Sequence, residues 1–478
     1  MTVALTLIAY QVVLLGIGYW ARNRSTTDEG YFLGGRGLGP WVASLSYAAG
    51  SSSAWSILGV SGIAFTQGMG SIWLLPGTIA GHIVVWFVVA PWLQRESHEK
   101  GWLTLTDVLV DGLPTRISRL SAQLAAVIVL VSFSFYVAAQ FQGAANTFTA
   151  VFDFQFIWAL LLGAAIVVVY TLMGGFWAVS LTDALQAILM LAAAIILPGV
   201  ALFEVGGFAA LLEASDSSPY WRLDGGNSGW FAVGFFLGMI GIGFGPVGQP
   251  HLLTRIMAMA ERREIRKARL ITICWFVVVL GGMYLLGLCG HLLLKGAAPG
   301  TEEQIFFLLA EDLLPAVLTG ILIAAVLSAI MSTADSQLLV AGSALHHDLA
   351  KGAKRESRQK PSAANNARRA VAIVAIAAVL LALFLPESIF SRVLFAWNAL
   401  GAAFGPLVVA RFLNWRVRSF AVPLAMLLGF GLTLLFYLRP DGPGDFWERV
   451  VPFVIAFGTL FLSKMPLQKI RTIADDEG

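Results

Sequence analysis

Apolar stretches of about 20 residues follow one another along almost the whole chain, and each is long enough to cross a bilayer as a helix. Hydrophobic residues make up 58% of the 478 residues and charged residues only 12%. A soluble protein carries about twice that charged fraction. Too little polar surface exists to cover such a core in water. We therefore predict an all-α polytopic membrane protein in which residues 1–478 form a single transmembrane domain.

Thirteen candidate spans account for the apolar stretches. They lie at about 3–21, 40–62, 71–93, 122–149, 156–173, 178–202, 230–250, 270–294, 313–345, 370–386, 389–410, 419–438 and 449–464. The first stretch, Thr2–Ala21, has no basic residue before it and no small-residue cleavage site after it. It is predicted to be a retained span and not a signal peptide. Polar connections are predicted at 203–229 and 350–367.

The basic residues predict an orientation. Most of the 31 Lys and Arg residues fall after the first, third, seventh, ninth and eleventh spans and in the C-terminal tail. The group after the seventh span is assigned to a connection running from Arg255 to Arg269. Lys and Arg are retained on the cytoplasmic side of a membrane. We therefore expect a protein of the cell inner (plasma) membrane, with its N-terminus outside and its C-terminus in the cytoplasm.

Two spans contain residues that interrupt helices. In the second span, Gly50 precedes three serines, Ser51–Ser53, near mid-membrane, and these are poor helix formers. In the seventh span, four glycines and a proline fall within 241–248. Interrupted segments at corresponding places in two halves indicate an inverted repeat with a binding site at the bilayer midplane. The alternative is that these small residues serve only close helix packing.

The ninth span holds a group of hydroxyl and carboxyl side chains. Ser332, Thr333, Asp335 and Ser336 occupy two turns of an otherwise apolar helix. Oxygen donors of this kind suit an alkali cation, and an unwound second span would add free carbonyl oxygens. We therefore predict a Na⁺ held between the two spans. The alternative is that Ser and Thr hydrogen-bond only to their own helix.

Other polar residues within spans are candidates for function. Asp183 lies near the cytoplasmic start of its span, where a carboxylate is either functional or a helix-start charge. His82 is interpreted as a hydrogen-bonded core histidine, with a proton relay as the alternative. Tyr136 and Gln140 share one helix face and could meet a solute, or they could pack in the core.

Three segments carry a resemblance to a known family: Gly174–Gln186, Gly248–Arg255 and, most specifically, Ala329–Val340. At these residues the chain resembles the solute:sodium symporter family, and among its members the bacterial sodium:proline symporters. The resemblance covers about the first 410 residues. It implies a LeuT-type 5+5 inverted-repeat core with repeats at about 40–202 and 230–410. Accessory helices are implied at 3–21, 419–438 and 449–464.

The resemblance also implies binding residues. The main sodium site would use backbone carbonyls of Ala49, Ser52 and Ala329 and the hydroxyls of Ser332 and Thr333. Some family members have a second sodium site, which would map here to Asp183, Ser332, Asp335 and Ser336. The solute would lie between the two breaks, against Ser53, Ala54, Trp55, Tyr136, Gln140 and the stretch from Ile242 to Phe244.

Three departures limit the choice of solute. Proline symporters have an acidic residue where this chain has Ser51 and a tryptophan where it has Ile242. Their Ser-Gly pair after the break is Ser53-Ala54 here. The expected solute is therefore proline or a similar amino acid. The alternatives are a carboxylate, a vitamin or a sugar.

The function expected from these features is sodium-coupled import of a small organic solute by alternating access. Na⁺ would be the coupling ion, with no cofactor and no transition metal. A proton-coupled transporter using Asp183 or His82, a channel and a membrane sensor are the alternatives. No clustered nucleophile and base are recognisable, so no enzyme is expected. The expected partners are the solute, Na⁺ and membrane lipid, with no nucleic acid and no obligate protein partner.

Overall fold

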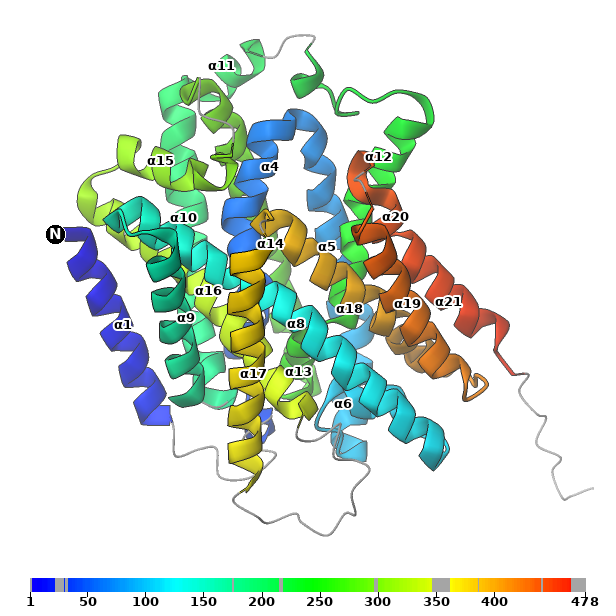
Figure 1. Ribbon diagram of the computed structural model, residues 1–478. Coiled ribbons are helices and arrows are strands. Elements are labelled where there is room, and N and C mark those ends of the chain that lie inside the picture. Colours follow the sequence, from blue (N-terminus) through cyan, green and yellow to red (C-terminus); the bar gives the residue numbers. More distant parts are fainter. Residues whose placement is uncertain are drawn as a thin grey trace, which may run out of the picture.

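The computed structural model describes residues 2–21, 30, 33–173, 176–214, 218–295, 300–345, 362–385, 387–439 and 442–465. Within these ranges the regular structure is helical, and β-structure is limited to two isolated bridges, Leu38 with Met259 and Val417 with Lys464. The longer helices lie side by side in one bundle (Figure 1). The predicted all-α class is confirmed.

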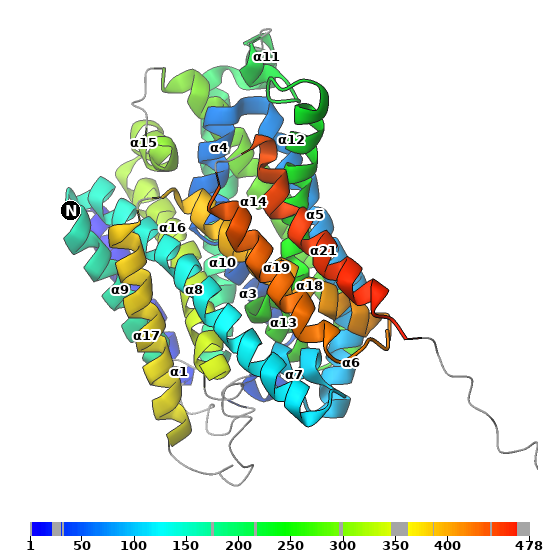
Figure 2. The same ribbon diagram turned by 45° about the vertical axis from the view of Figure 1, so that its right-hand side comes forward.

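The first half of the bundle contains α1 (Thr2–Ala21), η2 (Gly34–Arg36), α3 (Pro40–Ser51), η3 (Trp55–Gly59), α4 (Val60–Gln67), η4 (Gly68–Trp73), α5 (Leu74–Val84), η5 (Val85–Val89), α6 (Ala90–Lys100), α7 (Leu105–Val110), α8 (Thr115–Phe152), α9 (Phe156–Met173), α10 (Phe176–Val205), α11 (Gly207–Glu213) and η6 (Pro219–Trp221). Helix α8 crosses the bundle obliquely in both views (Figures 1 and 2). Helix α10 packs against α3, α14 and α16, so it lies between elements of both halves.

The second half contains α12 (Gly229–Gly241), η7 (Ile242–Gly248), α13 (Pro250–Met257), η8 (Arg262–Glu264), α14 (Ile265–Leu293), η9 (Glu302–Gln304), α15 (Ile305–Leu313), α16 (Ala316–Ser343), α17 (Ser362–Phe384) and α18 (Ile389–Phe412). It is followed by α19 (Ala421–Tyr437), η12 (Pro443–Asp445), α20 (Phe446–Arg449) and α21 (Val451–Leu462). Helix α18 is almost entirely buried and packs on η7 and α8. It therefore lies at the centre of the bundle.

Seven helical runs in the described ranges are long and apolar enough to cross a membrane. They are Trp55–Lys100, Thr115–Phe152, Phe176–Val205, Gly229–Gly248, Arg262–Leu293, Ala316–Ser343 and Ile389–Phe412. Shorter apolar helices lie at Phe156–Val169, Val371–Phe384 and Ala421–Tyr437. Each of the thirteen predicted spans overlaps helical residues. The count of thirteen crossings stays a prediction.

Both predicted interruptions are present. Helix α3 ends at Ser51, and Ser52 has the non-helical dihedrals φ −101° and ψ 75° before the chain turns into η3. Helix α12 ends at Gly241, and a 3-10 segment leads to an extended Gln249 before α13 begins. Close packing operates as well, because a Cβ on Gly243 would lie 2.1 Å from the carbonyl oxygen of Gly77 in α5. At the seventh span, glycine therefore serves both the break and the packing.

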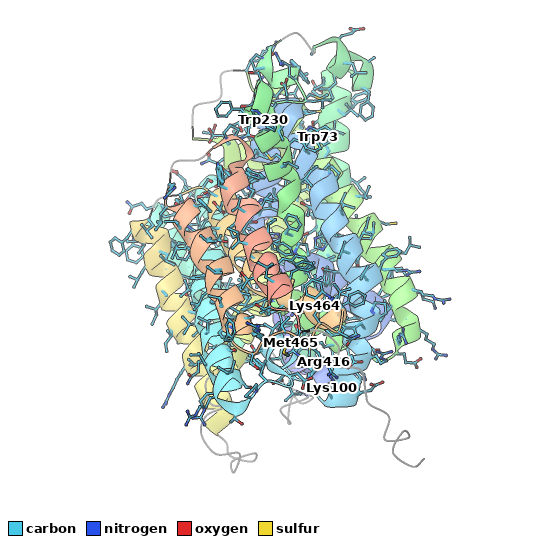
Figure 3. The ribbon with its side chains drawn as sticks, turned by 90° about the vertical axis from the view of Figure 1, so that its right-hand side faces the viewer. Trp73, Lys100, Trp230, Arg416, Lys464 and Met465 are labelled. Atoms are coloured by element: carbon cyan, nitrogen blue, oxygen red, sulfur yellow. The ribbon has the colours of Figure 1, made fainter. Side chains whose placement is uncertain are left out.

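The outer surface and the ends of the bundle fit a membrane setting. Large exposed apolar side chains occur along α1, α9, α14, α17 and α21, as expected where helices face lipid. Trp73 and Trp230 lie at one end of the bundle, and Lys100, Arg416 and Lys464 lie toward the other (Figure 3). Of the predicted basic connection at 350–367, residues 350–361 lie outside the described residues, and 362–367 form the first turns of α17 instead of a connection.

The predicted polar connection at 203–229 is more structured than expected. Tyr220 in η6 stacks on His291 with ring centroids 3.7 Å apart and donates a hydrogen bond to the carbonyl oxygen of Ala64 at 2.9 Å. The indole nitrogen of Trp73 donates to the carbonyl oxygen of Leu223 at 2.9 Å. This connection therefore packs across the ends of α4 and α14 and is not merely solvated chain.

Candidate functional site

The end of α3 faces the polar turns of α16. The Ser332 hydroxyl donates to the carbonyl oxygens of Ala49 and Ala329, both at 3.2 Å, and the Thr333 hydroxyl lies 3.4 Å from the same Ala49 oxygen. Both side chains are fully buried. Ser52 is next to this cluster along the chain, and its buried hydroxyl has no hydrogen-bond partner among the described residues. Four of the five residues predicted for the main sodium site are therefore joined by hydrogen bonds, with Ser52 beside them.

A second buried cluster joins four helices. The Asp183 carboxylate in α10 accepts hydrogen bonds at Oδ2 from Ser46 in α3 at 2.7 Å and from Arg255 in α13 at 3.2 Å. The same guanidinium nitrogen donates to the Ser336 hydroxyl in α16 at 2.5 Å. Ser336 in turn donates to Asp335 Oδ1 at 3.3 Å. Three of the residues predicted for a second sodium site, Asp183, Asp335 and Ser336, are thus linked through an arginine.

Arg255 is the residue that the sequence analysis placed wrongly. It was assigned to a polar connection, but its side chain is completely buried in α13, and Arg255 Nη1 donates to the His251 carbonyl oxygen at 2.8 Å. Arg255 was misplaced because the sequence does not show where α13, the helix after the break at η7, ends. The run Gly248–Arg255, which carried the family resemblance, was the available signal.

This cluster holds more acidic than basic side chains. Asp183 pairs with Arg255 at 3.2 Å, and Asp335 is linked to Arg255 through Ser336, which accepts from the guanidinium and donates to Asp335. Asp183 Oδ1 and Asp335 Oδ2 have no hydrogen-bond partner in the part of the chain that the structure describes. Buried charges are normally paired and buried polar atoms normally hydrogen-bonded. The two free oxygens can therefore accept a small cation.

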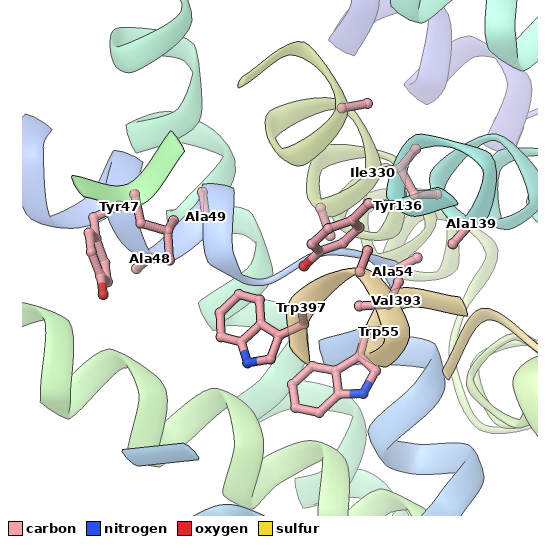
Figure 4. Close-up of a cluster of buried hydrophobic side chains, with 14 of the residues drawn as sticks. Tyr47, Ala48, Ala49, Ala54, Trp55, Tyr136, Ala139, Ile330, Val393 and Trp397 are labelled. Atoms are coloured by element: carbon pink, nitrogen blue, oxygen red, sulfur yellow. The ribbon is translucent and has the colours of Figure 1, made fainter. Parts of the chain in front are cut away.

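A small cavity of about 10 Å³ lies beside the unwound segment. Its lining residues come from the broken span, from α5, α8, η7, α14 and α18: Ser51, Trp55, Thr78, Tyr136, Ile242, Phe276, Val393, Leu394 and Trp397. The rings of Trp55, Tyr136 and Trp397 converge next to the non-helical stretch between Ala49 and Ala54 (Figure 4). A single water molecule needs roughly 10–15 Å³, so in this conformation the surrounding side chains nearly fill the space, and a solute would need them to move apart.

Of the predicted solute residues, Trp55, Tyr136 and Ile242 line the cavity. The others have different positions. Gln140 accepts a hydrogen bond from the backbone nitrogen of Ala54 at 3.0 Å, and the Ser53 hydroxyl accepts one from the backbone nitrogen of Trp55 at 3.1 Å. These residues therefore fix the shape of the unwound segment.

Phe244 lies away from the cavity. It is 36% exposed and stacks on Phe453 with ring centroids 4.5 Å apart. Six lining residues were not predicted as solute residues. Ser51 belonged to the recognised break and Thr78 is a polar residue in an apolar span. Nothing in the sequence distinguishes Phe276, Val393, Leu394 and Trp397 from apolar residues that only pack in the core.

The cavity wall is aromatic and uncharged. Four of the nine lining residues are aromatic, and none carries a formal charge. The indole nitrogen of Trp55 and the hydroxyl of Thr78 are buried without a hydrogen-bond partner among the described residues. Aromatic faces attract ammonium groups, and unpartnered donors can hydrogen-bond a polar ligand. The site therefore suits a small solute with both an apolar body and a cationic nitrogen.

His82 lies behind this wall, and its environment supports the interpretation as a core histidine. Its Nδ1 is 3.0 Å from the Tyr47 hydroxyl, and its ring stacks on Phe276 with centroids 3.8 Å apart. Within the described residues, no group of three His, Cys, Asp or Glu side chains could hold a metal ion.

The model of the sodium:solute symporter family matches residues 31–429. This chain belongs to that family. The sodium/proline symporter of Escherichia coli (strain K12) is 33% identical over 467 residues, covering 96% of this chain and 91% of that protein. The high-affinity proline transporter PutP of Bacillus subtilis (strain 168) is 34% identical over 477 residues, covering 97% of this chain and 98% of that protein. As expected, the family and these relatives are transporters and not enzymes.

Solved structures agree on the fold. A Na⁺-coupled sialic acid symporter in a substrate-bound outward-open state superposes with a TM-score of 0.82 at 16% identity, covering 97% of each chain. The transporter MhsT in complex with L-phenylalanine gives a TM-score of 0.52 at 15% identity, covering 88% of this chain and 98% of that one. The predicted LeuT-type fold is confirmed for this family member.

Proposed function

We propose that this sodium:solute symporter imports proline, or a similarly compact amino acid, together with Na⁺. The observation that carries the proposal is the contact of Ser332 and Thr333 with the Ala49 carbonyl at the end of the broken α3. That break continues into Ser51 and Trp55, which line the cavity. The relatives named above as proline symporters and transporters support proline as the solute.

The proposed main sodium site consists of the carbonyl oxygens of Ala49, Ser52 and Ala329 and the hydroxyl oxygens of Ser332 and Thr333. Hydroxyl and carbonyl oxygens are hard ligands suited to an alkali cation. The proposed second cation site uses Asp183, Asp335 and Ser336, with Ser332 one helical turn away. Support for it comes from the two unpartnered carboxylate oxygens beside Arg255.

The proposed mechanism couples the two ligands through the broken span. Na⁺ bound between α3 and α16 would order Ser51–Ala54, and this segment forms one edge of the solute cavity. The solute would in turn hold that segment in place and strengthen Na⁺ binding. Such coupling is reciprocal for binding free energies. The inward Na⁺ gradient would then drive solute release into the cytoplasm.

Contacts at both ends of the bundle are proposed to close the cavity. At one end, Trp55 stacks on Phe390 with ring centroids 6.1 Å apart. At the other, Arg36 donates to the carbonyl oxygens of Met257 and Trp102 at 3.2 and 2.8 Å. Opening them in turn would give alternating access. Because the basic residues gather at the Arg36 end, that end is proposed to be cytoplasmic.

The proposed arrangement is a single domain in the plasma membrane with the N-terminus outside and the C-terminus in the cytoplasm. Its repeats are proposed at about 40–202 and 230–410, with three accessory helices. The proposed partners are solute, Na⁺ and lipid, without a nucleic acid or an obligate protein partner. Labelling of single cysteines from the outside of intact cells tests the orientation at Trp230, which should react, and at Lys100, which should not.

Uptake of radiolabelled L-proline into proteoliposomes tests the function. We expect uptake when an inward Na⁺ gradient is imposed and none with K⁺ in its place. A panel of unlabelled amino acids, sugars and carboxylates competes with the label to define the solute class. Uptake driven by a proton gradient without Na⁺ would contradict sodium coupling. Sodium-driven uptake of a sugar, with no effect of proline, would contradict the proposed solute.

Replacing Gly245 by alanine should reduce sodium-dependent proline uptake at least tenfold. A Cβ at this position would lie 1.8 Å from the indole nitrogen of Trp397, and an atom pair cannot approach so closely. Trp397 lines the cavity and donates to the Ile242 carbonyl oxygen at 3.0 Å. Gly281→Ala is the matched control, because nothing lies within 4 Å of its added Cβ. Equal activity of the two variants would show that Trp397 does not shape the site.

A further inference from the structure

Arg449 ends α20 and is the first residue of the last predicted accessory helix, 449–464, and it is only 5% exposed. Its Nη2 pairs with Asp445 at 2.5 Å, and its Nη1 faces the sulfur of Met239 at 3.6 Å. Its Nε has no hydrogen-bond partner among the residues that the structure describes. A guanidinium has five N–H donors, and thioether sulfur is a weak acceptor. This buried cation therefore has hydrogen-bonding capacity that the described part of the chain does not use.

Arg449 does not line the cavity, but it contacts two residues, Phe390 and Gly241, that each adjoin a lining residue. Its Cζ is 5.9 Å from the Phe390 ring, and Phe390 stacks on Trp55, which lines the cavity. A Cβ on Gly241 would lie 3.4 Å from the Cβ of Arg449, and Gly241 directly precedes the lining residue Ile242. The guanidinium is thus next to the aromatic pair that covers the cavity.

The neighbouring residue of α20 is also tied to the cavity wall. Glu448 accepts a hydrogen bond from Asn398 at 3.1 Å, and Asn398 directly follows the lining residue Trp397. Helix α20 therefore packs against α12 and α18 at the same end of the cavity. The charges on η12 and α20 are one cation, Arg449, and two acids, Asp445 and Glu448; beside Phe390 lie a further acid, Glu303, which accepts from the Phe390 backbone nitrogen at 3.1 Å, and the buried cation Arg392. The acids would repel an anion, whereas a zwitterion can place its carboxylate on the Arg449 guanidinium and its ammonium group near the acids.

We propose that Arg449 binds the carboxylate of the solute at an outer subsite, which a zwitterionic amino acid enters as the Trp55–Phe390 pair opens. This proposal rests on the proposed function and adds to it the recognition of the carboxylate. None of the nine lining residues carries a positive charge, so the cavity itself offers no comparable partner. Charge-assisted bonds from arginine to carboxylate are among the strongest hydrogen bonds in proteins.

The proposal gives the accessory helices a role in selecting the solute. The subsite lies outside the ten-helix core, so selection for a carboxylate precedes binding in the aromatic cavity. Asp445 keeps the guanidinium in place from the preceding turn of the chain. Arg449 Nε is buried in this conformation, so an arriving carboxylate would reach it when Phe390 moves, while Asp445 keeps its bond to Nη2.

The test compares wild type, Arg449→Gln and Arg449→Lys in proteoliposomes. Competition of radiolabelled proline uptake by unlabelled L-proline and by proline methyl ester, which lacks the negative charge, reports carboxylate recognition. In wild type we expect proline to compete at least tenfold better than the ester. In R449Q we expect a KM for proline at least tenfold higher, an unchanged maximal rate and little difference between the two competitors. R449K should fall between them, because it keeps the charge but not the planar fork.

The control is Arg439→Gln, which removes an exposed arginine near the end of α19. It should behave as wild type. If R449Q weakens proline and its ester equally, Arg449 is structural and the proposal falls, as it does if the KM is unchanged. If wild type does not transport proline, the proposed solute is wrong. The same comparison is then run with the transported solute of the panel and its ester. A solute without a carboxylate would overturn the subsite.

Discussion

Replacing Ser332 by alanine is expected to raise the Na⁺ concentration for half-maximal proline uptake at least tenfold. Its hydroxyl bridges the Ala49 and Ala329 carbonyl oxygens, so it is the central proposed ligand. A hydrogen bond or ligand contact to a charged group contributes about 1.5–3 kcal/mol, and about 1.4 kcal/mol corresponds to a tenfold change in affinity. Initial uptake rates measured against Na⁺ at saturating proline report the change.

Thr333 offers a finer test of the same site. Thr333→Ala should also raise the Na⁺ requirement, whereas Thr333→Ser keeps the hydroxyl and should stay close to wild type. Ser343→Ala is the matched control, because among the described residues that hydroxyl bonds only within its own helix, to the Val340 carbonyl oxygen at 2.7 Å. Unchanged Na⁺ dependence in both S332A and T333A would remove these residues from the sodium site.

The sequence was informative about this site for two physical reasons. Polar side chains in an apolar span stand out because burying them is costly, so Ser332, Thr333 and Asp335 could be recognised without a structure. Glycine and serine runs weaken a helix, so the breaks at Ser51–Ser53 and after Gly241 could be placed to within a few residues. The contact between these two features follows from the fold and was expected from the family resemblance.

The cavity wall was harder to predict. Phe276, Val393 and Leu394 are apolar residues within apolar spans, and hydrophobic patterning does not separate a cavity wall from ordinary packing. Phe244 was expected beside the solute, but it stacks on Phe453 instead. In an irregular segment such as η7, no fixed period tells which side chain points inward. Arg255 was missed for a related reason, because α13 has no predictable end after a broken helix.

Replacing Arg255 by glutamine is expected to destabilise the protein severely, by about 3–5 kcal/mol, the usual cost of removing one partner of a buried ion pair. The substitution leaves Asp183 and Asp335 without the guanidinium that lies between them. Asp183→Asn should cost less, since Arg255 keeps Ser336 and the nearby Asp335. Thermal unfolding of the purified protein in detergent measures both.

The double variant D183N/R255Q decides whether the pair acts as a unit. With the Asp183 charge removed as well, part of the stability lost in R255Q should return, because one of the two unpaired buried charges is gone while Asp335 remains. The exposed pair Arg222 and Asp224 is the matched control, and its single and double variants should unfold like wild type. If the losses in R255Q and D183N simply add in the double variant, the two residues are not coupled. The four-helix cluster would then owe its stability to packing around Arg255, and its unbalanced charge would give no reason to expect a second cation there.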